Sequence, residues 1–315
     1  MQACRICGNT ADNKLHTARE MMFGMRETFT YLECRQCGCV QQLQPPANIA
    51  KYYPREYYSY AQHGNLKTFF RHHWAAYAFS SPDPVGWVFS RLFFPNAAMR
   101  AVRRLRPARQ ARILDVGCGA GHLLQDLSYL GFQNLTGADP FIERDRAYSG
   151  GLTIFKRELD QVEGQFDLLM LHHCFEHMDD PARKTRALAR LLAPGGTVLL
   201  RIPVASSLPW RRYGVNWVHL DAPRHFYLHT YKSIELLSKQ AGLGVAEVFQ
   251  EADQDTFWCS EAYAHDIAMN DPRFPPLFTF RKLRRWRQNR HYRAEAEALN
   301  CRGEADLVAF HLRKT

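Results

Sequence analysis

The chain has 315 residues, 46% of them hydrophobic and 23% charged, with a formal net charge of +10. This size allows one large domain and a small appendage, since domains usually hold about 100–200 residues. No stretch approaches the ~18 uncharged apolar residues that cross a membrane, and the amino terminus lacks the pattern of a secretory signal. We therefore expect a cytoplasmic protein without a membrane span, whose nine cysteines serve as thiols or metal ligands and not as disulfides.

Four zones follow one another along the chain. Residues 1–45 hold five of the nine cysteines, and residues 46–110 are rich in aromatic side chains without strand-like alternation. Residues 111–202 alternate short apolar runs with helical patterns, which predicts βαβ units and a parallel sheet. Residues 203–315 begin as an aromatic loop and continue through one helix to a final strand. We expect three units: a zinc-ribbon module (1–45), a helical linker or lid (46–110) and an α/β domain (111–315).

Two CxxC knuckles, each followed by glycine, lie in the first zone. Cys4 and Cys7 form the first knuckle, and Cys34 and Cys37 form the second. Each tight turn presents two thiolates, so the two pairs complete the tetrahedral sulfur shell of a zinc ribbon. Cys39 offers a substitute ligand, but the spacing favours Cys37. A four-thiolate site has no open position for chemistry, so we expect a structural zinc; a knuckle without metal is the alternative.

A glycine-rich turn follows the first predicted strand of the α/β domain. Asp115 lies near the end of this strand, and Gly117, Cys118, Gly119 and Gly121 form the turn before a helix. Glycine permits a tight turn and lets a ligand approach the backbone closely. The spacing differs from the Gly-x-Gly-x-x-Gly of dinucleotide binders. A strand-end carboxylate suits a ligand with a cationic amino group and no pyrophosphate, which predicts that these residues bind S-adenosylmethionine.

A second acidic residue, Asp139, closes the next predicted strand, 22 residues after Gly117. In nucleoside-binding α/β folds, an acid about 20 residues after the glycine turn accepts hydrogen bonds from the ribose hydroxyls. We expect Asp139 to have this role in cofactor binding. The alternative is that its carboxylate caps the turn before Pro140.

Four motifs in this order resemble class I S-adenosylmethionine-dependent methyltransferases across residues 111–250. Residues 115–121 match the first motif of that family, and Asp139 matches its ribose-binding acid. Residues 166–177 match the strand-four motif that ends in Glu-His, and residues 192–196 match the turn before strand five. The resemblance implies a Rossmann-like α/β sheet in the order 3-2-1-4-5-7-6, with strand seven antiparallel and helices on both faces.

The paired knuckles and the tyrosine-rich segment after them extend this resemblance. Together with the α/β domain they resemble the zinc-containing methyltransferases of deoxysugar and cell-surface glycan pathways, among which are the sugar C-methyltransferases. Residues 223–228 are similar to a Pro-x-His segment after strand five in related enzymes. The resemblance implies methyl transfer to a small-molecule acceptor.

The loops after strands four and five should meet at the acceptor, because ligands bind at the carboxyl ends of the strands in an open α/β sheet. Imidazoles titrate in the range useful for proton removal, so His177 and His225 are the candidate bases, with Glu176 orienting a neighbour. His172 and His173 are expected to line the cofactor pocket. The alternative is that Glu176 and His177 only cap the helix start or bond to neighbouring backbone, and that His225 only packs within its loop. The second loop offers three further polar candidates: His219, Asp221 and Arg224.

We therefore predict an enzyme that methylates a sugar or glycan precursor, such as a nucleotide sugar, at oxygen or carbon. One alternative is an RNA methyltransferase that binds phosphates through the zinc ribbon and basic helices, although no Asn/Asp-Pro-Pro-Tyr/Phe motif follows strand four. A second alternative is a zinc-ribbon binding protein with an inactive methyltransferase fold, which the intact Asp115 and Asp139 oppose. Arginines gather at 100–112 and 281–293, and we interpret both groups as solvated helical faces in preference to a nucleic-acid surface.

Overall fold

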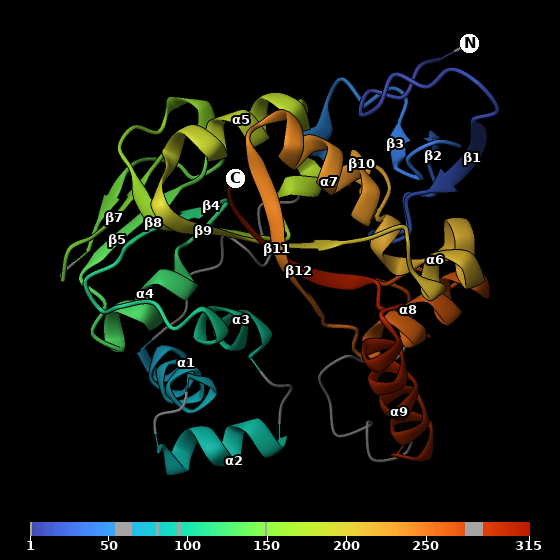
Figure 1. Cartoon of the computed structure of the whole chain (residues 1–315). Helices are drawn as coiled ribbons and strands as arrows, with labels where there is room; N and C mark the ends of the chain where they lie inside the picture. The colour runs from blue at the N-terminus through green and yellow to red at the C-terminus, as the bar shows by residue number, and fades with distance from the viewer. Residues whose placement is uncertain (1, 54–64, 80–81, 93–95, 149, 275–285) are drawn as a thin grey trace.

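A large mixed sheet crosses the molecule with helices on both sides, and a smaller sheet from the amino-terminal end lies beside it (Figure 1). The computed structural model describes residues 2–53, 65–79, 82–92, 96–148, 150–274 and 286–315.

The large sheet has eight strands in the order β11-β12-β9-β8-β4-β5-β7-β6. Strands β7, β5, β4, β8 and β9 run parallel, whereas β12 lies antiparallel between β9 and β11. This confirms the predicted order 3-2-1-4-5-7-6, to which β6 adds a short antiparallel edge. The bounds are β4 Arg112–Val116, β5 Asn134–Ala138, β6 Arg146–Ala147, β7 Leu152–Phe155, β8 Phe166–His172, β9 Leu192–Pro203, β11 Leu243–Gln250 and β12 Leu307–Lys314.

Alternating side chains on the central strands form two core layers. Leu114 and Leu169 pack in the layer that includes side chains of α5 (Pro181–Leu191) and α7 (Tyr231–Gln240). Ile113 and Leu168 pack in the layer that includes side chains of α3 (Ala97–Leu105) and α4 (His122–Tyr129). Neighbours in sequence separate in this way because successive side chains of a strand point to opposite faces. Helices therefore cover both faces of the sheet, as predicted.

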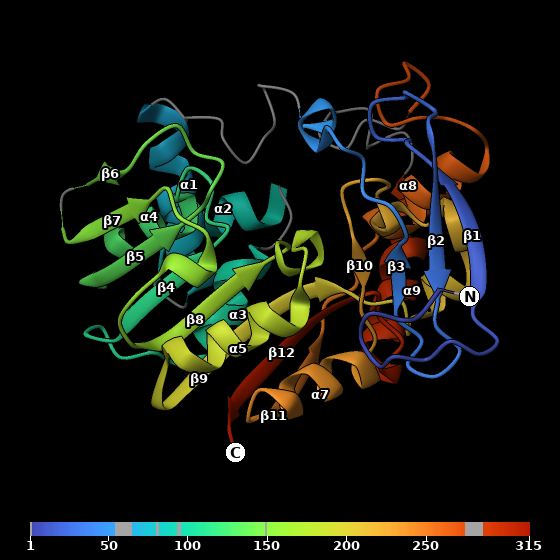
Figure 2. The same ribbon diagram turned by 90° about the horizontal axis from the view of Figure 1, so that it is seen from above.

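The amino-terminal module forms the smaller sheet together with a strand from much later in the chain. Its order is β1-β2-β3-β10, and all three pairings are antiparallel. The strands from the module are β1 (Lys14–Arg19), β2 (Thr28–Glu33) and β3 (Val40–Gln42). Strand β10 (Tyr227–Leu228) pairs Tyr227 with Gln41 and Leu228 with Val40, beside the three blue strands of Figure 2. The module therefore packs directly onto the loop that follows β9.

Helices connect the module to the large sheet in the described part of residues 46–110, for which a helical linker or lid was expected. A 3-10 helix, η1 (Ile49–Tyr52), precedes α1 (Asn65–Ala78) and α2 (Pro84–Leu92), and α3 follows them. Residues 54–64 of the tyrosine-rich segment lie outside the described residues.

Residues 193–196, where a turn was expected, form an irregularity at the start of β9: Leu192 pairs with Phe166, the next pair joins Thr197 to Leu168, and Gly195 has a positive φ of 74°. One sequence expectation for the second half of the chain was wrong. Residues 203–315 contain several helices where one was expected: α6 (Leu208–Tyr213), α7, α8 (Asp255–Ala264) and α9 (Trp286–Arg302). The apolar pattern of α9 is weak because few of its side chains are buried: Tyr292, Ala296 and Leu299 pack in one small cluster with Phe257 and Trp258 of α8.

Candidate functional site

The glycine-rich turn after β4 forms a tight loop beside the end of β8. Gly117, Gly119 and Gly121 all have positive φ angles, of 71°, 53° and 74°, which side chains other than glycine rarely adopt. A Cβ atom at Gly117 would lie 2.7 Å from the Cβ of Cys174, which follows β8. The absence of side chains thus lets the turn lie against the neighbouring loop, and Gly121 caps α4.

Asp115 and Asp139 place two buried carboxyl groups at this turn. Asp139 accepts hydrogen bonds from the Gly119 amide at 2.9 Å and from the Phe141 amide at 2.8 Å. It therefore caps the local turn, as the alternative expected, and also faces the glycine loop. Burial raises the pKa of Asp139; burial and then the charge of Asp139 raise the pKa of Asp115 to about 8.

The segment after β8 carries the histidines of the predicted strand-four motif. His172 is partly buried, and its Nδ1 lies 3.2 Å from Nη1 of Arg201. Burial, and then the positive charge of Arg201, lowers the pKa of His172 well below its usual value. His173 has a positive φ of 51° and is partly exposed, with its Nδ1 3.7 Å from Oε1 of Glu176.

Glu176, His177 and His225 come together at the carboxyl edge of the sheet. Glu176 and His177 belong to the 3-10 helix η4 (Phe175–His177), whereas His225 lies just before β10. One ligand atom of each side chain lies within 4.8 Å of those of the other two. Nε2 of His225 is 4.0 Å from Oε1 of Glu176, and the two imidazole rings meet edge-on with centroids 4.6 Å apart. The loops after β8 and β9 therefore do converge.

Main-chain carbonyls fix the protonation pattern of both imidazoles. Nδ1 of His177 lies 2.8 Å from the carbonyl oxygen of Arg224, and Nδ1 of His225 lies 2.7 Å from that of His219. A carbonyl oxygen can only accept, so each Nδ1 must carry the proton. When these rings are neutral, each Nε2 holds a lone pair.

The Glu176 carboxylate is fully buried, and neither oxygen has a hydrogen-bond partner among the described residues. Burial raises its pKa, but the adjacent imidazoles of His173, His225 and His177 outweigh burial and hold the pKa at about 2. Burial, and then the neighbouring His177, lowers the pKa of His225 to about 4. Near neutral pH the site therefore pairs an ionised carboxylate with a neutral His225.

The distance between the ligand atoms of His225 and Glu176 indicates whether they would bind a metal ion or a hydroxyl group. Two ligands bonded to one cation at about 2.1 Å lie roughly 3.0–3.4 Å apart. Two groups that share one hydroxyl oxygen through hydrogen bonds of about 2.8 Å lie roughly 4–4.6 Å apart. The observed 4.0 Å between His225 and Glu176 therefore suits a shared hydroxyl better than a metal ion.

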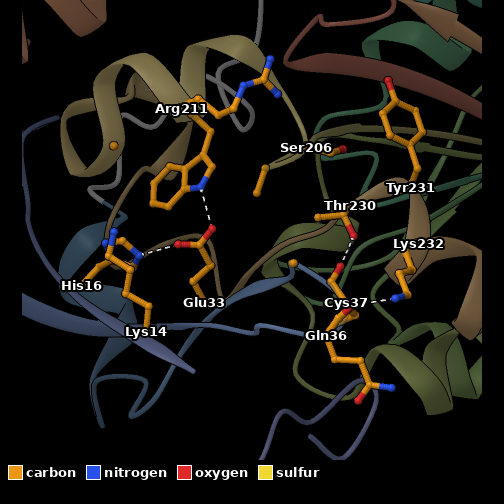
Figure 3. Close-up of a pocket in the computed structure, with 14 residues that line it drawn as sticks. Lys14, His16, Glu33, Gln36, Cys37, Ser206, Arg211, Thr230, Tyr231 and Lys232 are labelled. Carbon is orange, nitrogen blue, oxygen red and sulfur yellow. Dashed lines mark hydrogen bonds and ion pairs between the residues drawn. The ribbon is translucent and has the colours of Figure 1, made fainter. Parts of the chain in front are cut away.

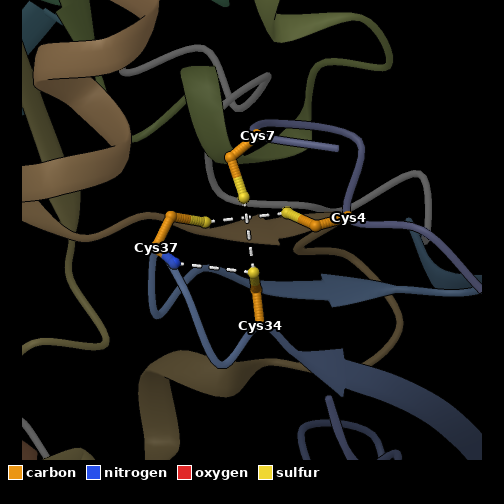
Figure 4. Close-up of side chains that lie close together, drawn as sticks. All are labelled: Cys4, Cys7, Cys34 and Cys37. Atoms are coloured by element: carbon orange, nitrogen blue, oxygen red, sulfur yellow. Dashed lines mark hydrogen bonds between the residues drawn. The ribbon is translucent and has the colours of Figure 1, made fainter. Parts of the chain in front are cut away.

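The four knuckle cysteines form a second cluster, in the amino-terminal module (Figure 4). The Sγ atoms of Cys4 and Cys37 are 3.6 Å apart, and those of Cys7 and Cys34 are 3.5 Å apart. All four sulfur atoms lie within 4.8 Å of one another, and none is in a disulfide. Each knuckle closes on a glycine with positive φ, Gly8 and Gly38, whose amides bond back to the first cysteine carbonyl.

A cleft of about 680 Å³ separates the module from the large domain (Figure 3). Its module wall includes His16 and Glu33, which form an ion pair of 2.7 Å, and its domain wall includes Trp210, whose indole nitrogen points to Glu33. The lining includes neither the glycine turn nor the Glu176 cluster. This cleft is therefore separate from the glycine turn and from the Glu176 cluster, although Cys37 of the second knuckle lines it.

The first group of arginines makes contacts within the chain. Arg112 pairs with Asp167 at 2.8 Å, Arg104 lies 3.6 Å from Glu251, and Arg109 lies over the ring of Phe132. Most of the segment 281–293 lies outside the described residues or has side chains that are not described. Within the described part of the chain, none of the helices combines the length and hydrophobicity that crossing a bilayer requires.

Three residues near the cluster carried no signal in the sequence. Tyr53 places its hydroxyl 3.0 Å from Nδ1 of His177, and Tyr31 donates to the carbonyl of His225 at 3.1 Å. Glu20 is fully buried and pairs with Arg224 at 3.2 Å. Tyr53 lies in the tyrosine-rich segment, but only the fold brings it next to His177.

Known proteins resemble this chain across the region that contains the site. The sequence family described as a methyltransferase domain matches residues 90–248, half of the chain. A ubiquinone biosynthesis O-methyltransferase from Xanthomonas axonopodis pv. citri is 34% identical over 165 residues, which cover 46% of this chain and 67% of that protein. One from Pseudomonas aeruginosa (strain UCBPP-PA14) is 34% identical over 100 residues, 28% of this chain and 43% of that protein.

Among solved structures, an S-adenosylmethionine-dependent methyltransferase from Mesorhizobium loti matches with a TM-score of 0.44 and 16% identity, over 70% of this chain and 99% of that one. The family match begins near the end of α2, ends within β11, and includes the glycine turn, Asp139 and η4. The chain therefore belongs to the methyltransferase-domain family and is a class I S-adenosylmethionine-dependent methyltransferase.

Proposed function

We propose that the protein transfers a methyl group to an oxygen atom of a small-molecule acceptor held between Glu176, His177 and His225. The observation that carries this proposal is the convergence of these three side chains beside the glycine turn. The name of the relatives, ubiquinone biosynthesis O-methyltransferase, favours oxygen over carbon. The hydroxyl belongs either to a sugar or glycan precursor, as the knuckle resemblance implies, or to a phenol.

Asp115, Gly117, Cys118, Gly119, Gly121 and Asp139 would hold the cofactor. The buried Asp115 supports this assignment, because a cationic amino group beside it would compensate a charge that burial disfavours. The carboxylate of Asp139 would accept hydrogen bonds from the ribose, and His172 and His173 would line the pocket. When bound, S-adenosylmethionine supplies an electrophilic methyl group on a sulfonium.

The chain's own residues would then orient the acceptor and take its proton. Nε2 of His177 or His225 is the acceptor of that proton, since both Nδ1 atoms already donate to carbonyls. The ionised Glu176 would stabilise the imidazolium that forms. Most of the rate would come from holding the acceptor oxygen in line with the methyl group.

The module would be a structural zinc ribbon whose ligands are Cys4, Cys7, Cys34 and Cys37. Sulfur atoms bound to zinc at about 2.3 Å lie roughly 3.8 Å apart, and the two measured pairs are only slightly closer. Elemental analysis should find about one zinc per chain. Cys34→Ser should lose it, whereas Cys39→Ser should retain it because Cys39 lies outside the cluster. Zinc retained in Cys34→Ser would contradict this ligand set.

A coupled assay of S-adenosylhomocysteine release tests the function. The purified enzyme is offered nucleotide sugars, catechols or RNA in separate arms, each with and without added Mg²⁺ or Zn²⁺. We expect release with one class, and a loss of about 10²-fold or more in Glu176→Gln, which keeps the shape but removes the charge. Release only with added metal would assign Glu176, His177 and His225 to a cation, and release only with RNA would overturn the small-molecule proposal.

A further inference from the structure

The loop that carries His225 is bound along its length by the amino-terminal module. Strand β10 forms the fourth strand of the module's sheet, and the Gln42 amide donates to the Phe226 carbonyl at 2.8 Å. Thr230 donates its hydroxyl hydrogen to the carbonyl of Cys37, in the second knuckle, at 2.6 Å. Main-chain and side-chain hydrogen bonds thus hold the loop to the module from residue 226 to residue 230.

A buried ion pair joins the module to the same loop just before β10. The guanidinium of Arg224 places both terminal nitrogens 3.2 Å from Oε1 of Glu20, and neither residue is exposed to solvent. The same guanidinium pairs with Asp221 of its own loop, because Nε donates to Oδ2 at 2.9 Å and Nη2 donates to Oδ1 at 2.5 Å, so Glu20 supplies the module's share of this network. Glu20 is itself fixed in the turn after β1, because it accepts the amides of Phe23 and Met25 at 2.9 Å each. Its position is therefore set by the module alone.

This ion pair acts on the acceptor site through one main-chain atom. The carbonyl of Arg224 is the group that accepts the Nδ1 proton of His177 at 2.8 Å. Tyr31, from β2 of the module, donates to the carbonyl of the next residue, His225, at 3.1 Å. If Arg224 shifts, Nδ1 of His177 keeps only the Tyr53 hydroxyl at 3.0 Å, which can donate as well as accept and so does not hold the proton on Nδ1.

We propose that Glu20 is a positioning residue for the acceptor site: by holding Arg224 it fixes His177 in the tautomer whose Nε2 is free. The module would then be part of the active site and not an independent appendage. The catalytic meaning of this inference rests on the proposed role of His177, whereas the tautomer itself can be measured without any acceptor.

The test compares Glu20→Gln with the wild-type protein by nitrogen-15 NMR of the imidazole rings at a pH where they are neutral. The amide of glutamine keeps the size of the side chain but removes the charge that pairs with Arg224. We expect a single Nδ1–H tautomer of His177 in the wild type and a mixture in Glu20→Gln. Zinc content and affinity for S-adenosylmethionine should stay within about twofold, and turnover should fall about tenfold without a change in the acceptor's KM.

Glu33→Gln is the matched control. Glu33 lies in the same module and pairs with His16 at 2.7 Å, but its side-chain contacts, to His16 and Trp210, are on the cleft side and not on the loop 221–226. It should leave the His177 tautomer and turnover unchanged. An unchanged tautomer in Glu20→Gln, or an equal shift in Glu33→Gln, would overturn the proposal.

A second variant decides the question if Glu20→Gln does not fold. Tyr31→Phe removes only the hydroxyl that donates to the His225 carbonyl, without leaving a charge unpaired. A new tautomer mixture at His177, whose Nδ1 partner is the carbonyl of the residue before His225, would support positioning by the module, and an unchanged spectrum would overturn it. A tautomer shift in either variant without any methyl transfer by the wild type would leave the positioning role intact and reject the proposed function instead.

Discussion

The proposed site has two halves at the carboxyl edge of the large sheet, one for the cofactor and one for the acceptor, and different kinds of contact hold each half in place. In the proposed site, the cofactor half comes mainly from one short stretch, residues 115–139, where the Asp139 carboxylate bonds to the main-chain amides of Gly119 and Phe141. The acceptor half comes from η4, from the loop before β10 and from the module, and buried charges hold it together. The first half therefore depends on backbone shape, whereas the second depends on pairs of side chains that meet only in the folded protein.

If the acceptor half contains the base, removing one imidazole should have the largest effect. We expect His225→Ala or His177→Ala to lower turnover by ~10²–10⁴-fold, the usual contribution of a general base. Affinity for S-adenosylmethionine, measured by calorimetry, should stay within about twofold, because the cofactor half shares no side chain with these residues.

His311→Ala is the control for this pair, since His311 is a buried histidine on β12 whose partner is Glu247. Wild-type turnover in both test variants would mean that these histidines only pack. If instead His225→Ala or His177→Ala lost affinity for S-adenosylmethionine, these histidines would belong to the cofactor half. The two halves would then not be separate in their residues.

A side chain added to the glycine turn should damage the cofactor half by shape alone. Valine at position 117 would combine a positive φ with a Cβ 2.7 Å from that of Cys174. The clash should cost ~1–3 kcal/mol beyond the backbone strain, so the Kd for S-adenosylmethionine should rise about 10- to 100-fold. Gly131→Val is the control: its φ is +88°, but nothing lies within 4 Å of the added Cβ. Equal affinities in the two variants would refute the argument from shape.

This contrast also explains which parts of the molecule the sequence could predict. The sheet order and the glycine turn were predictable because their signals are local: an apolar strand, glycines at fixed spacing and an acid at the end of the next strand. The cysteine knuckles are equally local, and the four thiols do come together. Glu176, His177 and His225 could be named because the strand order places their two loops next to each other.

The network around those residues could not be predicted, for a physical reason. Glu20 and Arg224 are 204 positions apart, and a charged residue in a turn gives no sign that it will be buried. Pairing of β10 with β3 depends on two residues, too few to show the alternation of a strand. The helices of the carboxyl-terminal region were missed because α9 contacts α8 through only a few side chains.

The raised pKa of Asp115 should make cofactor affinity depend on pH. The carboxyl group must be ionised to compensate the cofactor's amino group, and its pKa of about 8 leaves it mostly protonated below that pH. Affinity for S-adenosylmethionine should therefore rise almost tenfold per pH unit well below pH 8, and ~25-fold from pH 6.0 to 7.5. Calorimetry at constant ionic strength measures this slope, which Asp115→Asn should abolish. A flat profile in the wild type would show that Asp115 does not face the amino group.

The smallest effect is expected at Asp139, where the carboxylate has two tasks. It already accepts the Gly119 and Phe141 amides, and each oxygen keeps a further lone pair for a ribose hydroxyl. Because hydrogen bonds to a charged group contribute ~1.5–3 kcal/mol each, Asp139→Ala should weaken S-adenosylmethionine binding about tenfold or more. Asp145→Ala is the matched control, since Asp145 accepts the Lys156 amide at 2.7 Å without facing the glycine turn. Unchanged affinity in Asp139→Ala would mean that this carboxylate only caps its turn, and that the ribose hydroxyls bind to other groups of the cofactor half.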